Sequence, residues 1–146
     1  MRVETEVVIN RPVDQVFGFI VDVASSTSWS ENIVEATKTS NGPVTIGSTC
    51  KIVTCAMGHT ITHEFEVTDY LPGKKYTVQS FSGPFHVTMS YITHEVPEGT
   101  RLNAVSEVEL VGPMGLFGTI MSERIQKQFD SDHSNLKRLL ESTYNA

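Results

Sequence analysis

Residues 61–67 read ITHEFEV, and apolar and polar side chains alternate along this segment. Ile61, Phe65 and Val67 share one side, and the threonine and the two glutamates between them share the other. This alternation predicts a strand with one buried and one exposed face, because successive side chains on a strand point to opposite sides. His63 falls among the apolar residues, so we expect an imidazole on the buried face.

The rest of the chain places this segment in a larger antiparallel sheet. Short turns rich in glycine and proline, such as Leu71-Pro72-Gly73 and Pro97-Glu98-Gly99, separate alternating segments and predict hairpins between neighbouring strands. We expect seven strands, at residues 2–10, 33–40, 48–57, 59–70, 74–81, 85–96 and 100–111.

Helical spacing replaces strand alternation in three segments. Residues 11–22 are predicted to form a short helix, with Pro12 in its first turn, where no amide partner is needed. Residues 23–32 contain capping serines and Trp29, which favours a second short helix. Residues 113–144 are predicted to form one helix about 45 Å long. Its apolar stripe comprises Met114, Met121, Ile125, Phe129, Leu136, Leu139 and Leu140.

This order of elements predicts an α+β fold. A seven-stranded curved antiparallel sheet would wrap around the long C-terminal helix, with the two short helices between strands 1 and 2. Because one helix cannot fill a strongly curled sheet, we expect a cavity between them.

Composition limits the classes of function. The chain has 146 residues and a net charge of −6, which disfavours binding to nucleic acid or to anionic lipid surfaces. We expect a single domain over residues 1–146. With neither a signal peptide nor a stretch long enough for stable membrane insertion, the expected location is cytoplasmic.

Neither a metal nor a cofactor is expected. His59 and His63 would lie about 13 Å apart on a strand, too far to chelate one ion. Cys50 and Cys55 should point to opposite faces of their strand, so we expect no disulfide between them, and neither has a CxxC partner.

The whole chain resembles the START/Bet v 1-like (SRPBCC) superfamily, close to its polyketide cyclase/dehydrase and lipid-transport branch. The resemblance rests on INRPVDQVFGFIVD (9–22), Trp29, Ile46-Gly47, the DYLPGKKYTV segment (69–78), GTRL (99–102) and the final LKRLLE (136–141). It implies a helix-grip fold with a hydrophobic ligand cavity. Fold alone does not specify chemistry, and no catalytic motif of the superfamily could be matched to residues of this chain.

Strand phase and the helical stripe predict which side chains line that cavity. The expected ligand-binding residues are Thr54, His63, Phe65, Tyr76, Val78, Phe85, Val87, Met89, Tyr91, Ser106, Met121, Ile125 and Phe129. The alternative is that these residues simply pack a closed core.

His63 and Asp132 are the two candidate catalytic residues. Asp132 falls within the apolar stripe of the long helix, where a buried carboxylate should be paired, protonated or hydrated. If the two side chains meet, Asp132 would fix the tautomer of His63 and raise its pKa, which would give a general acid/base pair. Otherwise His63 is a neutral core histidine with one hydrogen bond, and Asp132 reaches the rim of the stripe.

Residues 112–121 (GPMGLFGTIM) contain three glycines, but the lysine of a phosphate-binding loop is missing. Leu116, Phe117 and Ile120 fall on the outer side of the long helix, which fits a mobile cavity mouth, a homodimer contact or packing under a loop.

These features favour a protein that binds a small hydrophobic molecule, such as a lipid, an isoprenoid or a polyketide-like compound. The first alternative is a cyclase- or dehydratase-type enzyme that uses His63 with Asp132 or a cavity tyrosine. The second alternative is a protein-interaction or chaperone-cofactor module.

Overall fold

The computed structural model describes residues 1–56, 58–109 and 118–143. Within these ranges, the side chains of Ala56, Thr143 and residues 118–122 are not described. The expected helical start at residues 113–117 and the apolar group at Leu116 and Phe117 therefore lie outside the described residues.

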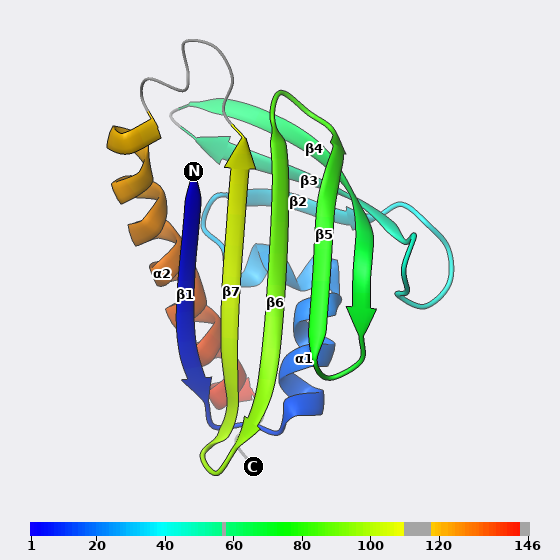
Figure 1. The fold of residues 1–146 in the computed structure, drawn as a ribbon, viewed down its shortest axis with the longest axis vertical. Helices are drawn as coiled ribbons and strands as arrows, with labels where there is room; N and C mark the ends of the chain where they lie inside the picture. The colour runs from blue at the N-terminus through cyan, green and yellow to red at the C-terminus, as the bar shows by residue number, and fades with distance from the viewer. Residues whose placement is uncertain (57, 110–117, 144–146) are drawn as a thin grey trace.

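Seven antiparallel strands form one sheet in the order β1-β7-β6-β5-β4-β3-β2, which confirms the predicted architecture. The strands are β1 (Arg2–Ile9), β2 (Ile33–Lys38), β3 (Thr49–Ala56), β4 (His59–Leu71), β5 (Lys75–Ser82), β6 (His86–Val96) and β7 (Gly99–Glu109). The sheet twists strongly, so that β2 and β3 cross the direction of β1 and β7 (Figure 1).

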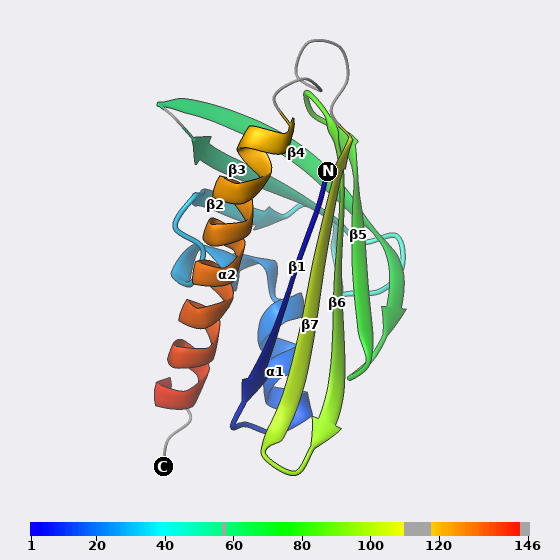
Figure 2. The same cartoon turned by 60° about the vertical axis from the view of Figure 1, so that its left-hand side comes forward.

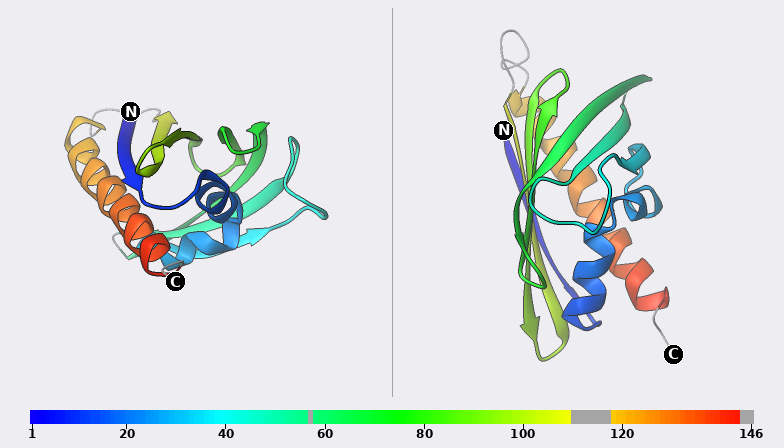
Figure 3. Two further views of the ribbon diagram at one scale, coloured as in Figure 1. Left: turned by 90° about the horizontal axis from the view of Figure 1, so that it is seen from below. Right: turned by 90° about the vertical axis from the view of Figure 1, so that its right-hand side faces the viewer.

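The helices lie on the concave side of the sheet, as expected for a helix-grip fold (Figure 3). The short helix α1 (Val13–Val21) follows β1, and the 3-10 helix η1 (Val23–Ser28) follows α1. The long helix α2 (Gly118–Thr143) crosses the sheet. Two short helices between the first and second strands are thus confirmed.

The serine-rich sequence explains why η1 is a tight and short helix. Ser26, Thr27 and Ser28 each donate a side-chain hydrogen bond to the backbone carbonyl three residues earlier. Such local bonds compete with regular α-helical bonding, and they hold this turn in place before β2. The backbone therefore leaves η1 with Trp29 and Ser30 directed towards α2.

Helix α2 also covers the exposed edge of the sheet at β1, beside which it runs (Figure 2). The Gln126 side chain donates a hydrogen bond of 2.8 Å to the carbonyl of Glu4, and Lys137 donates one of 2.7 Å to the carbonyl of Val8. These bonds satisfy backbone groups that an edge strand leaves unpaired. They fix the position of the helix over the cavity.

Candidate functional site

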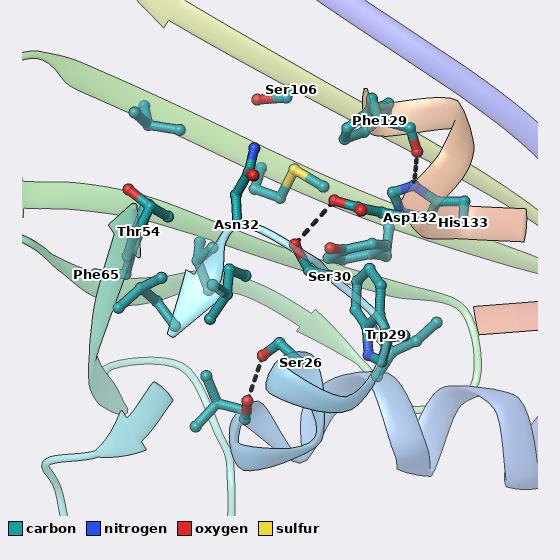
Figure 4. A pocket seen from close by; sticks show the side chains of 18 of the residues that line it. Ser26, Trp29, Ser30, Asn32, Thr54, Phe65, Ser106, Phe129, Asp132 and His133 are labelled. Atoms are coloured by element: carbon teal, nitrogen blue, oxygen red, sulfur yellow. Dashed lines mark hydrogen bonds between the residues drawn. The ribbon is translucent and has the colours of Figure 1, made fainter. Parts of the chain in front are cut away.

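A cavity of about 310 Å³ lies between the sheet, η1 and α2. This size falls within the usual range for small-molecule sites. The sheet wall is formed by Cys50, Ile52, Thr54, Phe65, Tyr76, Val78, Val87, Met89, Tyr91 and Ser106. The helical wall and the start of β2 contribute Ile20, Val23, Ser26, Trp29, Ser30, Asn32, Ile33, Ile125, Gln128, Phe129, Asp132 and His133 (Figure 4).

Most of the residues predicted to bind a ligand lie on this cavity. They are Thr54, Phe65, Tyr76, Val78, Val87, Met89, Tyr91, Ser106, Ile125 and Phe129. His63 and Phe85 are not among the lining residues. The side chain of Met121 lies outside the described part of the chain.

His63 does not line the cavity and is packed among neighbouring side chains of the sheet. The side chain is only 6% exposed, and its Nε2 donates a hydrogen bond of 3.1 Å to the carbonyl of Phe85. Its ring packs against Phe65 and Phe85, with centroids 5.8 and 4.8 Å apart. Burial lowers the pKa of His63 and outweighs the opposite effect of the hydrogen bond to Phe85, so the neutral ring is favoured.

Gly83, in the turn between β5 and β6, explains why this imidazole is enclosed. Its φ is +141°, and a Cβ built on it would lie 2.3 Å from Cδ2 of His63. Only glycine leaves room for the ring to lie against this turn. His63 therefore supports the β5–β6 turn beyond the cavity.

Asp132 does line the cavity, but its partners differ from the predicted one. The side chain is 8% exposed and accepts hydrogen bonds from Ser30 Oγ and Gln128 Nε2, both at 2.8 Å. The backbone amide of Glu31 donates a third bond, at 3.3 Å. The hypothesis of a His63–Asp132 pair is wrong, because each side chain is bonded to other groups at a different place in the fold.

Two tyrosines, Tyr76 on β5 and Tyr91 on β6, belong to the sheet wall of the cavity. The rings of Tyr76 and Tyr91 stack with centroids 6.3 Å apart. Burial raises the pKa of both phenols, and Asp132 adds to the effect on Tyr91. Burial also raises the pKa of the Cys50 thiol to about 11. At neutral pH these three groups are uncharged and can act as hydrogen-bonding groups.

His133 is a cavity residue that the sequence analysis did not identify. It is 1% exposed, and its Nδ1 donates a hydrogen bond of 2.7 Å to the carbonyl of Phe129. Its ring lies 5.3 Å from that of Trp29, centroid to centroid. Nε2 of His133 and Nε1 of Trp29 are buried and have no hydrogen-bond partner among the described residues. Two residues of the cavity wall, Trp29 and His133, therefore each hold a buried ring nitrogen without a partner.

The signal for His133 was present in the helical spacing, four residues after Phe129 and three before Leu136. Ser26, Ser30 and Asn32 gave no such signal. They belong to a short serine-rich segment, and its contact with α2 joins residues about a hundred positions apart. Periodicity cannot detect a contact of this kind.

The described residues contain no group of three or more histidine, cysteine or acidic side chains arranged to hold a metal ion. Both cysteines are free. Within the same residues, no helix combines the length and the apolar character needed to cross a membrane.

Residues 1–141 match the family described as polyketide cyclase / dehydrase and lipid transport. The chain belongs to the polyketide cyclase/dehydrase and lipid-transport family. Among curated proteins, no sequence matches this chain.

Solved structures show the same fold at low sequence identity. TTHA0849 from Thermus thermophilus has a TM-score of 0.85 and 17% identity, over 99% of this chain and all of that one. The Zhui aromatase/cyclase from Streptomyces sp. R1128 has a TM-score of 0.80 and 14% identity, over 100% and 96% of the two chains. Ara h 8.0201 has a TM-score of 0.70 and 12% identity, over 97% and 98%. The family match confirms the polyketide cyclase/dehydrase and lipid-transport branch to which the sequence was compared, and these solved structures confirm the fold.

The side chains that line the cavity determine which molecules the protein can hold and which groups could act on them. Aliphatic and aromatic side chains can enclose an apolar body, while Asp132, Ser30 and Asn32 supply hydrogen bonds on one wall. Membership of the family supports a role in ligand binding or in cyclisation.

Proposed function

We propose that the protein binds a small hydrophobic molecule, such as a lipid, an isoprenoid or a polyketide-like compound, in the cavity between the sheet and α2. The observation that carries this proposal is the composition of the cavity wall. Apolar side chains from five strands and α2 surround a space of about 310 Å³, and a smaller number of polar side chains, among them Ser30, Asn32 and Asp132, interrupt this apolar lining. Such a space favours an apolar ligand that a few hydrogen bonds orient.

The alternative of a closed core fits the cavity less well. Protein interiors are close-packed, and voids larger than a water molecule are few. A volume of about 310 Å³ corresponds to about ten water molecules at about 30 Å³ each. Water in contact with Phe65, Val78 and Met89 would gain few hydrogen bonds, so an apolar guest that displaces it is favoured.

Native mass spectrometry of protein purified without detergent tests this proposal. We expect a discrete additional mass close to one equivalent, and solvent extraction should release a hydrophobic compound that explains it. A protein with no additional mass that also fails to take up any apolar compound would contradict the proposal.

A second candidate function is a cyclase- or dehydratase-type reaction, and the placement of Asp132 and Tyr91 favours it. Both side chains line the cavity, so the carboxylate could act as a base while the protonated phenol of Tyr91 orients a substrate carbonyl by a hydrogen bond. His63 takes no part in this version, because it lies outside the cavity wall. Turnover of an added polyketide-like substrate that Asp132→Asn abolishes, with ligand binding retained, would favour the enzyme.

The interaction-module alternative depended on the apolar group at residues 112–121, whose side chains lie outside the described part of the chain. It stays a prediction from the sequence, as does the homodimer.

A further inference from the structure

The charges around the cavity are unbalanced. Asp132 is the only carboxylate among the described lining residues, and none of those residues is a lysine or an arginine. All the salt bridges between described residues lie elsewhere, at the surface of the sheet and along α2. A negative charge therefore borders the cavity without a cation to neutralise it.

His133, the one lining residue that could become cationic, does not supply the missing charge. Burial lowers its pKa and outweighs the hydrogen bond to Phe129 and the nearby negative charge of Asp132, which act in the opposite direction. The hydrogen bond to the carbonyl of Phe129 fixes Nδ1 as the donor. At neutral pH its Nε2 is therefore an acceptor.

The carboxylate of Asp132 is fixed in position. Ser30 and Gln128 donate to different oxygens of Asp132, and the backbone of Glu31 adds a third bond. All three groups are donors, a pattern that fits the ionised form. Figure 4 shows Asp132 and Ser30 directed towards each other at the cavity, with Asn32 beside them. A ligand group that reaches this wall meets a preorganised acceptor.

We propose that this wall selects hydrophobic molecules with an uncharged hydroxyl group, an alcohol or a phenol, and rejects carboxylates such as fatty acids. The proposal rests on the proposed function, since it specifies which apolar ligands the cavity accepts. A hydroxyl can donate to Asp132, whereas a carboxylate would bring a second negative charge beside it, with no cation to offset the repulsion.

Binding of 1-decanol and of decanoate, two ligands with the same number of carbons, tests this selection. Trp29 is the only tryptophan in the chain and lines the cavity, so its fluorescence reports occupancy. At neutral pH we expect decanol to bind at least about tenfold more tightly than decanoate. An alcohol also enters any apolar cavity more easily than a carboxylate does. The contribution of Asp132 therefore has to be measured by substitution.

Asp132→Asn removes the charge at nearly constant size and should reduce the ratio of the two affinities about tenfold, mainly through tighter decanoate binding. Asp130→Asn is the matched control. It removes the same charge two residues away, on an exposed side chain that does not line the cavity. The ratio should stay at its wild-type value in this control.

Gln128→Lys provides a second test if Asp132→Asn does not fold. Gln128 lines the cavity one helical turn before Asp132, so a lysine there would supply the missing cation. We expect decanoate affinity to rise in this variant.

The possible results distinguish a failure of the proposed ligand selection from a failure of the proposed binding function. Decanoate that binds wild type as tightly as decanol, or a ratio that neither Asp132→Asn nor Gln128→Lys changes, would overturn the selection and leave the binding function standing. Failure of both ligands to bind wild type would overturn the selection. The binding function would be overturned with it only if native mass spectrometry also shows no additional mass and no apolar compound is taken up.

Discussion

Ser30 and Asp132 are 102 positions apart in the sequence, and a buried hydrogen bond of 2.8 Å joins Ser30 Oγ to the carboxylate of Asp132. This bond connects the segment after η1 to the middle of α2. It therefore ties together the two elements that close the cavity opposite the sheet, and it orients the only carboxylate on the described cavity wall.

Ser30→Ala should destabilise the fold by about 1–3 kcal/mol, because it leaves a buried carboxylate with one donor fewer. The free energy of unfolding from urea denaturation measures this loss. Ser28→Ala is the control, since Ser28 is exposed and its hydroxyl bonds only within η1. That variant should change stability by less than about 0.5 kcal/mol. Equal losses of stability in the two variants would show that the Ser30–Asp132 hydrogen bond stabilises the fold no more than the local bond of Ser28 does.

Gly83→Ala should cost about 2–4 kcal/mol of stability. The added methyl group would occupy a position 2.3 Å from the ring of His63, on a residue with a φ of +141°. Gly42→Ala is the matched comparison, because Gly42 has a φ of +83° but no atom within 4 Å of the position that an added Cβ would take. Its cost should be limited to about 1–2 kcal/mol of backbone strain.

A double-mutant cycle isolates the contact between Gly83 and His63. In a His63→Ala background, the cost of Gly83→Ala should fall to about that of Gly42→Ala. A cost that stays the same with and without the imidazole would contradict the account of His63 as the support for this turn.

Stability should decrease as the pH falls below about 6.5, the ordinary pKa of histidine. Burial lowers the pKa of His133 and of His63 in the folded state. Between the folded and the unfolded pKa values, the unfolded chain binds more protons, so acid favours unfolding. This contribution to stability is complete above the unfolded pKa and decreases down to the folded pKa.

Urea denaturation between about pH 7.5 and about pH 5 measures this dependence. His133→Gln should reduce the slope of stability against pH, whereas replacement of the exposed His94 by glutamine should leave it unchanged. A slope that His133→Gln does not alter would contradict the role assigned to this buried imidazole.

Strand alternation was sufficient to predict the sheet and its inner face. Phe65, Val78, Val87 and Tyr91 were assigned to the cavity side from phase alone, because the two-residue period of a strand fixes which face each side chain occupies. All four line the cavity.

The same rule could not locate a side chain along the strand relative to the helix. His63 shares a face with Phe65 but lies one step beyond the cavity, where the turn at Gly83 covers it. The helical spacing carried a signal for His133, but whether Ser30 reaches the cavity depends on how η1 and α2 meet in three dimensions. Local patterns give no information on that arrangement, so Ser30 and its bond to Asp132 could be identified only from the structure.

The most direct test of the binding function compares two adjacent substitutions on β7. Ser106 lines the cavity, and Glu107 is exposed on the opposite face of the strand, so Ser106→Phe fills the cavity while Glu107→Phe adds the same ring outside. Binding of 1-decanol, followed by Trp29 fluorescence, is the measurement. We predict that wild type and Glu107→Phe bind decanol with similar affinity and that Ser106→Phe, with its fold intact by circular dichroism, loses at least about tenfold. Equal decanol affinity in all three proteins would contradict the claim that the ligand occupies this cavity.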